Sequence, residues 1–396
     1  MRPLAGLRVL DIATYIAAPY CATLFAEFGA EVIKVEMPGG EPMRRFGSRV
    51  ECGETLVWLS EARNKRCVTL NLKSEQGQAI FRRLAAKADV ITENFRTGTL
   101  ERWGLGYERL AEENPGLIML RVTGYGQTGP YAKRPGFGRI ANAFGGIAYL
   151  AGDPDRPPAT PGSATLADYM SGLYGAFGVM LALRAREQSG RGQVVDMALY
   201  ESIFRILDEL APAYDQFGYI RERMGAGTVN VVPHSHYPTA DGRWVAIACT
   251  NDKIFARLAR AMGRADLAGD GPYGTITERE AARSDVDHLV TAWTSAHTSE
   301  EVIRRCDEAE VPCGPVAAID ELFDNPQYAA RENIARIQDS RVGELAVPNV
   351  VPRLTETPGG VDHLGAGVGA HNDQVYREWL GLDEADLNAL RRDGVI

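Results

Sequence analysis

Short apolar runs alternate with more polar segments along the first 200 residues of the chain. The apolar runs predict buried strands at 7–12, 31–36, 67–72, 89–93, 117–122 and 194–199. The segments between and after them predict helices at about 18–28, 74–88, 99–113, 168–184 and 201–216. Gly29 and Ser74 are residues typical of a helix end and a helix start. This alternation favours an α/β fold with a parallel sheet and helices on both of its faces.

The loops at the carboxyl ends of the predicted strands are the expected ligand site, because ligands of open parallel sheets bind there. Two of these loops, 93–98 and 123–130, are rich in glycine and polar residues. Glycine lets a backbone approach a ligand closely. Neither loop has a Walker A or a GxGxxG pattern, so ATP and NAD binding are not supported.

The pattern of apolar and polar residues changes in the second half of the chain. It predicts a compact α+β section at 231–334. Within it, two alternating runs flank Asp241-Gly242, which is a strong signal for a β-hairpin. The tail from about residue 343 returns to strand and helix, and ends with predicted helices at 373–380 and 384–392. The chain is therefore expected to form two domains.

Composition matches an ordinary globular protein, with 45% hydrophobic and 24% charged residues in 396. A net charge of −9 argues against general nucleic-acid binding. The six cysteines are scattered without a CxxC pair, so neither a disulfide framework nor a metal site is expected. The N-terminus lacks an apolar signal core and no run approaches the length of a membrane span. The expected location is cytoplasmic, without membrane contact.

One basic stretch stands out in this acidic chain. Residues 61–140 contain 14 Lys or Arg and 8 Asp or Glu, a balance that suits a ligand with several phosphates. The cations on the predicted helix at 74–88 are expected to face water. The donors that remain for phosphate lie further along, at Asn94, Arg96 and Arg102.

Asp168 is the strongest candidate for chemistry. It lies in the segment Ser163–Gly172, at the start of a long predicted helix. Unpaired N–H groups and the helix dipole favour an ionised acid there. An ionised aspartate without a water shell can act as a nucleophile. Thr165 and Asp168 also fit a capping-box pattern, so a purely structural role stays open.

Several short segments stand in the order and at the spacing of one known family. They are 4–11, 28–36, 64–66, 93–96, 124–126, the Asp168 segment and 311–316. On these segments the chain resembles the family III CoA-transferases, the group that contains formyl-CoA:oxalate and carnitine CoA-transferases. The resemblance covers essentially the whole chain.

The resemblance implies an architecture and an assembly. A large Rossmann-like CoA-binding domain would be built from both ends of the chain, and a smaller α+β domain from its middle. Family members form interlocked dimers, in which each chain passes through a hole in its partner. On this sequence the parts would be 1–200 for the first part of the large domain, 201–230 for a linker, 231–334 for the small domain and 335–396 for a second linker and the rest of the large domain.

The resemblance also implies site residues. Asp168 matches the family's catalytic aspartate. The residues that would contact CoA are Ile16, Ala17, Leu70, Lys73, Asn94, Phe95, Arg96 and Arg102.

The chain departs from the family pattern at several positions. Met37 stands where some members have an Arg near the adenine. Phe137-Gly138-Arg139 replaces a common Tyr followed by an acid, and the added positive charge favours an acceptor with an extra carboxylate. The hypothesis is that Arg139, with Phe137 and Gly138, contacts that acceptor. The roles of His234 and His236 stay open.

The implied activity is transfer of CoA from a donor thioester, expected to be succinyl-CoA, to a C4–C6 dicarboxylate or a substituted succinate. It would proceed through an aspartyl mixed anhydride and an enzyme-bound thioester at Asp168, with CoA as substrate and no tightly bound cofactor. Intramolecular transfer within one diacid is an alternative. An α-methylacyl-CoA racemase is another, although no His precedes position 234. A non-catalytic CoA-binding subunit is a third. The expected partner is a second copy of the chain, or else a paralogous subunit.

Overall fold

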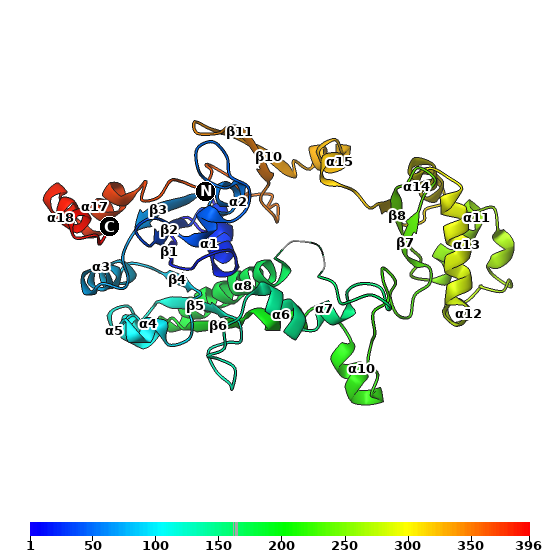
Figure 1. Ribbon diagram of the computed structural model, residues 1–396, viewed down its shortest axis with the longest axis horizontal. Helices are drawn as coiled ribbons and strands as arrows, with labels where there is room; N and C mark the ends of the chain where they lie inside the picture. The colour runs from blue at the N-terminus through cyan, green and yellow to red at the C-terminus, as the bar shows by residue number, and fades with distance from the viewer. Residues whose placement is uncertain (161, 163–164) are drawn as a thin grey trace. The chain divides into compact units, whose positions relative to one another are not determined.

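The computed structural model describes residues 1–160, 162 and 165–396, which form two units (Figure 1). Unit 1 contains the described residues of 1–148, 160–219 and 327–396, and unit 2 contains 149–159 and 220–326. The fold is the expected α/β architecture, with the larger unit built from both ends of the chain. The observed borders differ from those predicted, because much of the expected linker at 201–230 is helical and belongs to unit 1, and unit 2 ends at 326 instead of 334.

Unit 1 is built on a six-stranded parallel sheet with the order β3-β2-β1-β4-β5-β6. The strands are β1 (Arg8–Asp11), β2 (Glu31–Glu36), β3 (Lys65–Thr69), β4 (Val90–Glu93), β5 (Ile118–Thr123) and β6 (Val194–Ala198). All six predicted strands are present. The strand order runs outward from β1 on one side and from β4 on the other. The loops after these two strands therefore leave in opposite directions and open a crevice between them.

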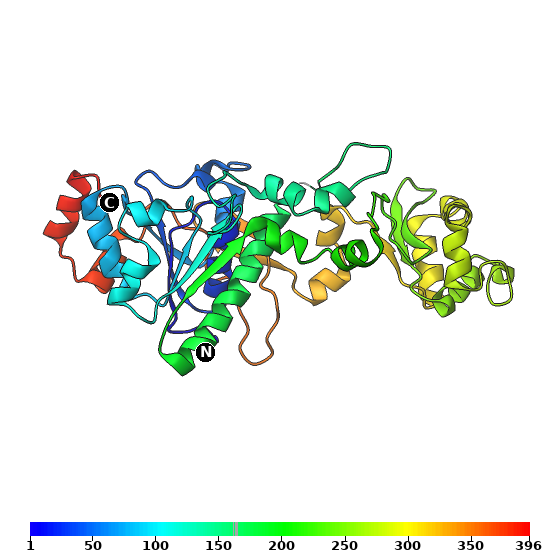
Figure 2. The ribbon, with the colours of Figure 1, turned by 90° about the horizontal axis from the view of Figure 1, so that it is seen from below.

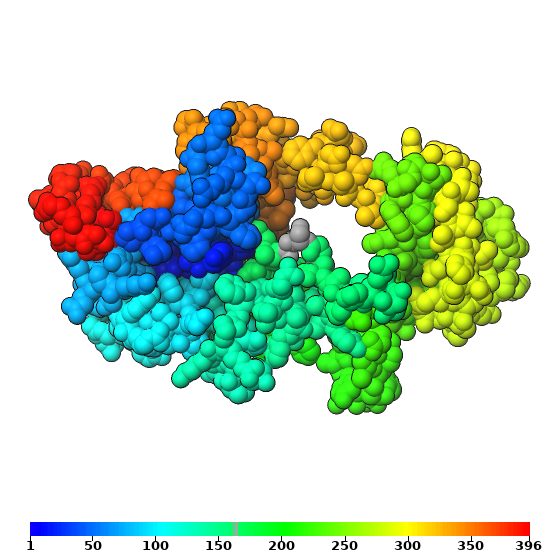
Figure 3. Space-filling view, in the orientation of Figure 1, coloured from blue at the N-terminus to red at the C-terminus, as the bar shows by residue number. Residues whose placement is uncertain are grey.

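Helices cover both faces of this sheet, and Figure 2 shows the sheet between the two helix layers. One apolar core packs the sheet against α1 (Ala17–Glu27), α6 (Gly138–Phe144), α8 (Leu166–Ser189) and α9 (Leu199–Phe204). The other packs it against α3 (Glu75–Ala85), α4 (Thr99–Arg102), α5 (Tyr107–Glu113), α17 (Asn372–Leu380) and α18 (Glu384–Arg392). Figure 3 shows the C-terminal segment (red) beside the segment that contains α3, and Arg83 on α3 donates a hydrogen bond to Leu380 O (2.9 Å).

The helix α8 lies close to its neighbours because its buried face is made of small residues. A Cβ at Gly172 would lie 2.5 Å from Ala17 O, and one at Gly175 would lie 2.8 Å from a Leu120 methyl group.

By length and composition alone, α8 could cross a membrane, so the expectation that no run approaches that length is wrong. Core helices of globular domains pass the same test, and α8 packs on α1, β5 and β6.

Two predicted helices are broken in the structure. The segment 99–113 forms α4 and α5, separated by Gly104 with a φ of +64°. The segment 201–216 forms α9 and α10 (Leu210–Phe217), separated by Asp208 with a φ of +42°. A residue in this left-handed region cannot continue a right-handed helix. The predicted caps are confirmed at Ser74, which accepts a hydrogen bond from Gly77 N, and at Gly29, with a φ of +97°.

The remaining elements are short or belong to unit 2. Those at the edges or borders of unit 1 are η1 (Pro42–Arg45), α2 (Leu56–Glu61), α7 (Ile147–Leu150), α16 (Pro326–Ala330), β10 (Ile334–Asp339) and β11 (Gly343–Pro348). Unit 2 has an antiparallel sheet of β7 (His234–Pro238), β8 (Trp244–Ala248) and β9 (Cys313–Pro315), which confirms the predicted hairpin. Its helices are α11 (Asp252–Ala261), η2 (Ala265–Leu267), α12 (Ile276–Ala281), α13 (Arg283–Ser295), α14 (Ser299–Glu308) and α15 (Ile319–Phe323).

Candidate active site

The loop after β1 is held in one conformation from two sides. Asn94, directly after β4, accepts a hydrogen bond from Thr14 N (2.9 Å) and donates one to Thr14 O (2.7 Å). Glu41 accepts a hydrogen bond from Tyr15 N (2.8 Å). Tyr15 has a φ of +63°, a conformation that costs a non-glycine residue free energy. The sequence predicts Asn94 as a donor to phosphate, but the structure engages its amide with the backbone of Thr14.

Buried ion pairs hold Glu41 in place. Lys34 Nζ lies 2.7 Å from Glu41 Oε1 and 3.4 Å from Asp11 Oδ2, and all three side chains are at most 2% exposed. Lys65 Nζ lies 3.0 Å from the same Asp11 oxygen. Burial raises the pKa of Glu41, against the lowering effect of Lys34. Buried side chains stay charged when they are paired with opposite charges. The ion pairs therefore fix the position of Glu41 and, through its hydrogen bond to Tyr15 N, the loop after β1.

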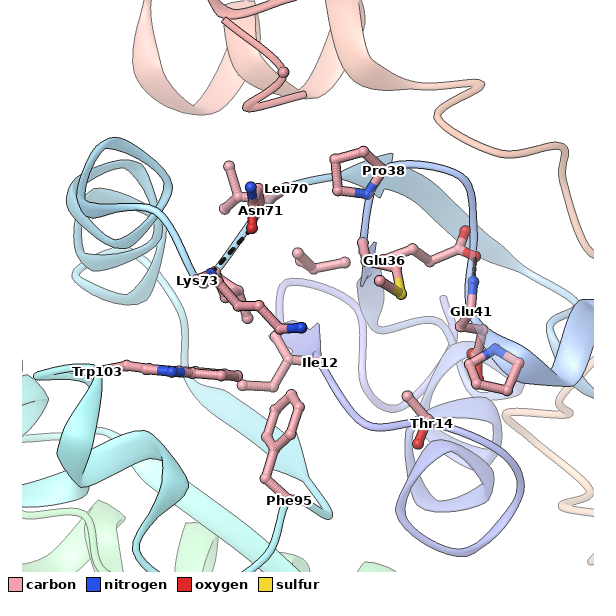
Figure 4. A pocket seen from close by; sticks show the side chains of 15 residues that line it. Ile12, Thr14, Glu36, Pro38, Glu41, Leu70, Asn71, Lys73, Phe95 and Trp103 are labelled. Atoms are coloured by element: carbon pink, nitrogen blue, oxygen red, sulfur yellow. Dashed lines mark hydrogen bonds between the residues drawn. The ribbon is translucent and has the colours of Figure 1, made fainter.

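The larger of two neighbouring cavities on unit 1 has a volume of about 440 Å³ and opens at the carboxyl ends of the strands. Its walls come from the loops after β1, β2, β3 and β4, and include Ile12, Thr14, Met37, Pro38, Leu70, Lys73, Phe95 and Trp103. Figure 4 shows the Lys73 side chain extending into this cavity, with Trp103 and Phe95 facing it. The two rings pack edge to face, with centroids 5.3 Å apart. The cavity thus offers apolar surface together with one ammonium group.

The smaller cavity has a volume of about 190 Å³ and shares Thr14 and Phe95 with the larger one. Asp168 lies in its wall, together with Arg96 and Arg134. Arg134 stacks over the Tyr131 ring, with its guanidinium carbon 3.6 Å from the ring centroid. Among the described residues, neither Arg96 nor Arg134 has an ion-pair partner. The cavity therefore holds one carboxylate and two cations that no carboxylate in this part of the chain neutralises.

Asp168 is the third residue of α8, in the first turn. Thr165 makes no side-chain capping bond, so the capping-box alternative is wrong. Ser163 and Ala164, which begin the sequence motif, lie outside the described residues. A methyl group at Gly138, the first residue of α6, would overlap Asp168 Oδ2 and would lie 3.0 Å from Asp168 Cγ. The carboxylate is therefore seated against the bare backbone of Gly138.

The environment of Asp168 makes its carboxylate easier to protonate. Burial raises its pKa from 3.8 to about 6, against a lowering effect of its own backbone N–H. The sequence-based argument expects the helix N-terminus to keep this acid ionised, but burial outweighs that effect. A group with a pKa of about 6 is still mainly ionised at pH 7. Within the described part of the chain, no side chain pairs with this carboxylate, so its lone pairs are free to attack.

Comparison with known proteins places the chain in a family. Residues 4–372 match the family model described as CoA-transferase family III. The chain belongs to CoA-transferase family III. It is an enzyme, and Asp168 and the residues that line the two cavities fall within the matched region, except Gly394 of the larger cavity.

Relatives of this CoA-transferase act on CoA thioesters, by their names. The beta and alpha subunits of a succinyl-CoA:L-malate CoA-transferase from Chloroflexus aurantiacus are 55% and 52% identical to it, over 100% of this chain and 98% and 92% of theirs. A succinyl-CoA:D-citramalate CoA-transferase from the same organism is 45% identical, over 100% of this chain and 98% of its own. The crystal structure of a CaiB/BaiF family protein from Brucella suis superposes with a TM-score of 0.84 at 33% identity, covering 96% of this chain and 99% of that chain.

In this CoA-transferase, most of the predicted site residues line one of the two cavities. Leu70 and Lys73 line the larger cavity. Those in the wall of the smaller one are Ala17, Asn94, Phe95, Arg96, Phe137 and Asp168. Gly138 contributes by the close approach of its backbone to Asp168. The structure thus gathers residues that are more than 150 positions apart in the sequence.

Four predicted residues line neither cavity: Ile16, Arg102, Gly138 and Arg139. Ile16 is 6% exposed and packs in an apolar cluster, so only its backbone is left to contact CoA. Arg102 donates a hydrogen bond to Thr99 Oγ1 (3.0 Å). Arg139 Nη1 lies 3.4 Å from Thr160 Oγ1. The contact of Arg139 with the acceptor stays a prediction.

The cavity-lining residues that sequence reasoning missed include Tyr15, Trp103 and Arg134. Tyr15 lies in the loop after the first strand, so the rule on strand ends could have found it. Arg134 belongs to the basic stretch 61–140 and lies in a loop. The sequence gives no sign that Trp103 lines a cavity, because an isolated aromatic residue in a predicted helix usually packs in the core.

The described residues contain no group of three or more His, Cys, Asp or Glu side chains that could hold a metal ion. His234 and His236 lie on β7 in unit 2. The Nδ1 atom of His234 is buried, without a hydrogen-bond partner in the described part of the chain.

Proposed function

We propose that this enzyme transfers CoA from succinyl-CoA to a 2-hydroxy dicarboxylate of the malate or citramalate type, through covalent intermediates on Asp168. The observation that carries the proposal is a carboxylate that shares a cavity with two arginines, all three without an ion-pair partner among the described residues. The names of the relatives support this choice of donor and acceptor.

A panel of acceptors tests the proposal. The purified enzyme is incubated with succinyl-CoA and, in turn, malate, citramalate, itaconate, mesaconate or benzylsuccinate. We expect succinate and the acceptor's CoA thioester in equal amounts, with the highest rates for the 2-hydroxy acids. Formation of no new thioester with any acceptor would refute the proposal.

In this proposal the nucleotide end of CoA occupies the larger cavity, whose apolar walls suit a base and whose Lys73 suits a phosphate. The pantetheine arm then passes Thr14 and Phe95, the residues common to both cavities. The thioester is thereby placed at Asp168. The two cavities together fall within the size range of ligand pockets, roughly 300–1,000 Å³.

The proposed mechanism has four steps. The Asp168 carboxylate attacks the succinyl thioester, and CoA leaves as thiolate from a mixed anhydride of Asp168 and succinate. The thiolate then attacks the Asp168 carbonyl, which releases succinate and leaves an aspartyl-CoA thioester. The acceptor carboxylate attacks this thioester and displaces the thiolate. Finally, the thiolate attacks the acceptor acyl carbon, which gives the product thioester and restores Asp168. The unpaired N–H groups in the first turn of α6, beside the carboxylate, are available to each oxyanion.

We expect the transfer rate to fall at low pH. The nucleophile is the ionised carboxylate, and its pKa of about 6 means that protonation removes it below that pH. The rate of transfer at saturating substrates should be flat above about pH 7 and fall about tenfold per unit well below pH 6. Initial rates measured across this range check the prediction. CoA affinity is measured in parallel, because the phosphates of CoA also titrate. A rate that is constant down to pH 5 at constant affinity would contradict it.

Arg134 is the proposed contact for the second carboxylate of the acceptor. Its guanidinium lines the Asp168 cavity without an ion-pair partner in the described residues. Arg134→Gln should raise the KM for malate about ten- to hundredfold, the value of a charge-assisted hydrogen bond. The KM for a monocarboxylate of equal length should stay the same, because it lacks the second carboxylate.

Arg139→Gln is the matched comparison for this test. Arg139 has the same charge and lies close by in the sequence, but its side chain reaches Thr160. It should leave the KM for malate unchanged. If Arg139→Gln raises this KM and Arg134→Gln does not, the sequence-based hypothesis for Arg139 is right and the assignment to Arg134 is wrong.

A racemase is a weaker candidate. It would need an acid/base histidine at 136–138, where the chain has Gly-Phe-Gly, and the first histidine is His234 in unit 2. Incorporation of labelled free succinate into succinyl-CoA would distinguish transfer from racemisation, because only transfer exchanges the carboxylate of the thioester. Intramolecular transfer would instead give a thioester isomer without any free acceptor.

We propose that a second copy of this chain is the partner. The face of α8 that points away from the sheet exposes Leu173, Phe177, Met180 and Leu181, each more than 40% exposed. Contiguous apolar surface of this kind marks a protein interface. The alpha and beta subunits among the relatives support a paralogous partner as the alternative.

A further inference from the structure

Three aromatic side chains stand together at the Asp168 cavity. The Tyr15 ring packs edge to face with Phe46 and with Phe137, in each case with centroids 6.3 Å apart and an interplanar angle of 88°. Tyr15 and Phe137 line the cavity that contains Asp168. We call Tyr15, Phe46 and Phe137 the aromatic frame.

Packing in the apolar core does not account for the aromatic frame. Tyr15 is 36% exposed, Phe46 is 47% exposed and Phe137 is 68% exposed. None of the three belongs to the apolar clusters formed by the described residues. Large apolar rings left in contact with solvent beside a reactive carboxylate call for a functional explanation.

The position of the Tyr15 ring is maintained at a cost in free energy. Its backbone is left-handed, and this conformation is held by Glu41, which is clamped by the buried Lys34. Glycine would adopt the same backbone without strain. Strain of this kind persists where the surrounding structure enforces it, typically at functional sites. The strained loop delivers one feature that glycine could not, the ring between Phe46 and Phe137.

We propose that the aromatic frame shields the covalent intermediates on Asp168 from water. This inference rests on the proposed function. In the aspartyl-CoA thioester, water would add to the carbonyl carbon, the C–S bond would break, and free CoA thiol, a proton and the Asp168 carboxylate would result. In the mixed anhydride, water would give two carboxylates and two protons. Apolar ring edges offer water no hydrogen-bond partners, so water is disfavoured along this wall.

The readout is the number of free CoA thiols released per molecule of acceptor thioester formed, with succinyl-CoA and malate as the probes. Tyr15→Gly removes the ring and also relieves the backbone strain, so the fold should be retained. We expect it to raise this ratio at least tenfold. Phe137→Ala should change it in the same direction. Tyr15→Phe keeps the ring and should stay within twofold of the wild-type ratio.

Phe323→Ala is the matched control for surface aromatics, because Phe323 is 45% exposed on α15 of unit 2. It should leave the ratio unchanged. A ratio within twofold of wild type in both Tyr15→Gly and Phe137→Ala, or loss of transfer in both without hydrolysis, would overturn the shielding role. That outcome differs from failure of the proposed function, in which the wild-type enzyme itself forms no acceptor thioester.

Discussion

Asp168→Asn should lower the rate of CoA transfer at least about 10⁴-fold, because a carboxamide cannot take the place of the attacking carboxylate. Asp168 lines the smaller cavity and not the larger one. Affinity for CoA should therefore stay within about threefold, since the nucleotide would bind in the larger cavity. The transfer rate is measured as malyl-CoA formed from succinyl-CoA and malate, and the affinity by calorimetry.

The same substitution should not damage the fold. The folded-state pKa of Asp168, about 6, lies above the ordinary 3.8, so the protonated group stabilises the fold at low pH and this contribution is lost as the pH rises through 6. A neutral Asn should thus raise the free energy of unfolding at pH 7 by roughly 1–3 kcal/mol. The gain should shrink as the pH falls below the pKa. If Asp168→Asn still transfers CoA, Asp168 is not the nucleophile. If the variant loses CoA affinity together with transfer, the loss of transfer is due to weaker CoA binding and not to the missing nucleophile.

Gly138→Ala should lower the transfer rate by about two to three orders of magnitude while the protein stays folded. The new methyl group would overlap Asp168 Oδ2. The carboxylate is the end of a rotatable side chain, so it can turn away at small cost to stability. Alanine also favours the helical position that Gly138 holds in α6. Loss of alignment by about 1 Å is enough to cost a large factor in rate.

Gly367→Ala is the control for this prediction. Gly367 is also in unit 1 and has no positive φ, and a methyl group added to it would meet no other atom within 4 Å among the described residues. It should leave both rate and stability unchanged. Steady-state kinetics together with thermal unfolding separate the two effects. If Gly138→Ala transfers CoA at the wild-type rate, the carboxylate does not act from its position against the Gly138 backbone.

The strands β1 to β5 are predictable because most of their residues are buried and therefore form apolar runs in the sequence. The predicted strand at 31–36 has the same bounds as β2. The breaks at Gly104 and Asp208 could not be predicted, since tertiary contacts decide whether one glycine or aspartate leaves the helical region. The domain border near 220 has no compositional mark, so the sequence gives only a linker at 201–230, within which the border falls.

The sequence predicts a site residue when its function depends on its side-chain chemistry. It does not predict properties that depend on the residues packed around it. Asp168 stands out as an acid at a helix start, and the family resemblance reinforces it. Its raised pKa is set by burial, which a linear sequence does not show. The sequence-based hypothesis names Arg139 because its positive charge follows Phe137-Gly138, where the family commonly has a Tyr and an acid. The direction of its side chain, toward Thr160, is a property of the fold.

The most direct test of the central claim is to trap the enzyme during turnover. The enzyme is mixed with succinyl-CoA, reduced with borohydride and digested, and the peptide that contains Asp168 is analysed by mass spectrometry. An aspartyl-CoA thioester at Asp168 would be reduced to the alcohol, so we predict homoserine at position 168 after donor addition and not without it. An unmodified Asp168 peptide from enzyme that is turning over would contradict the covalent mechanism.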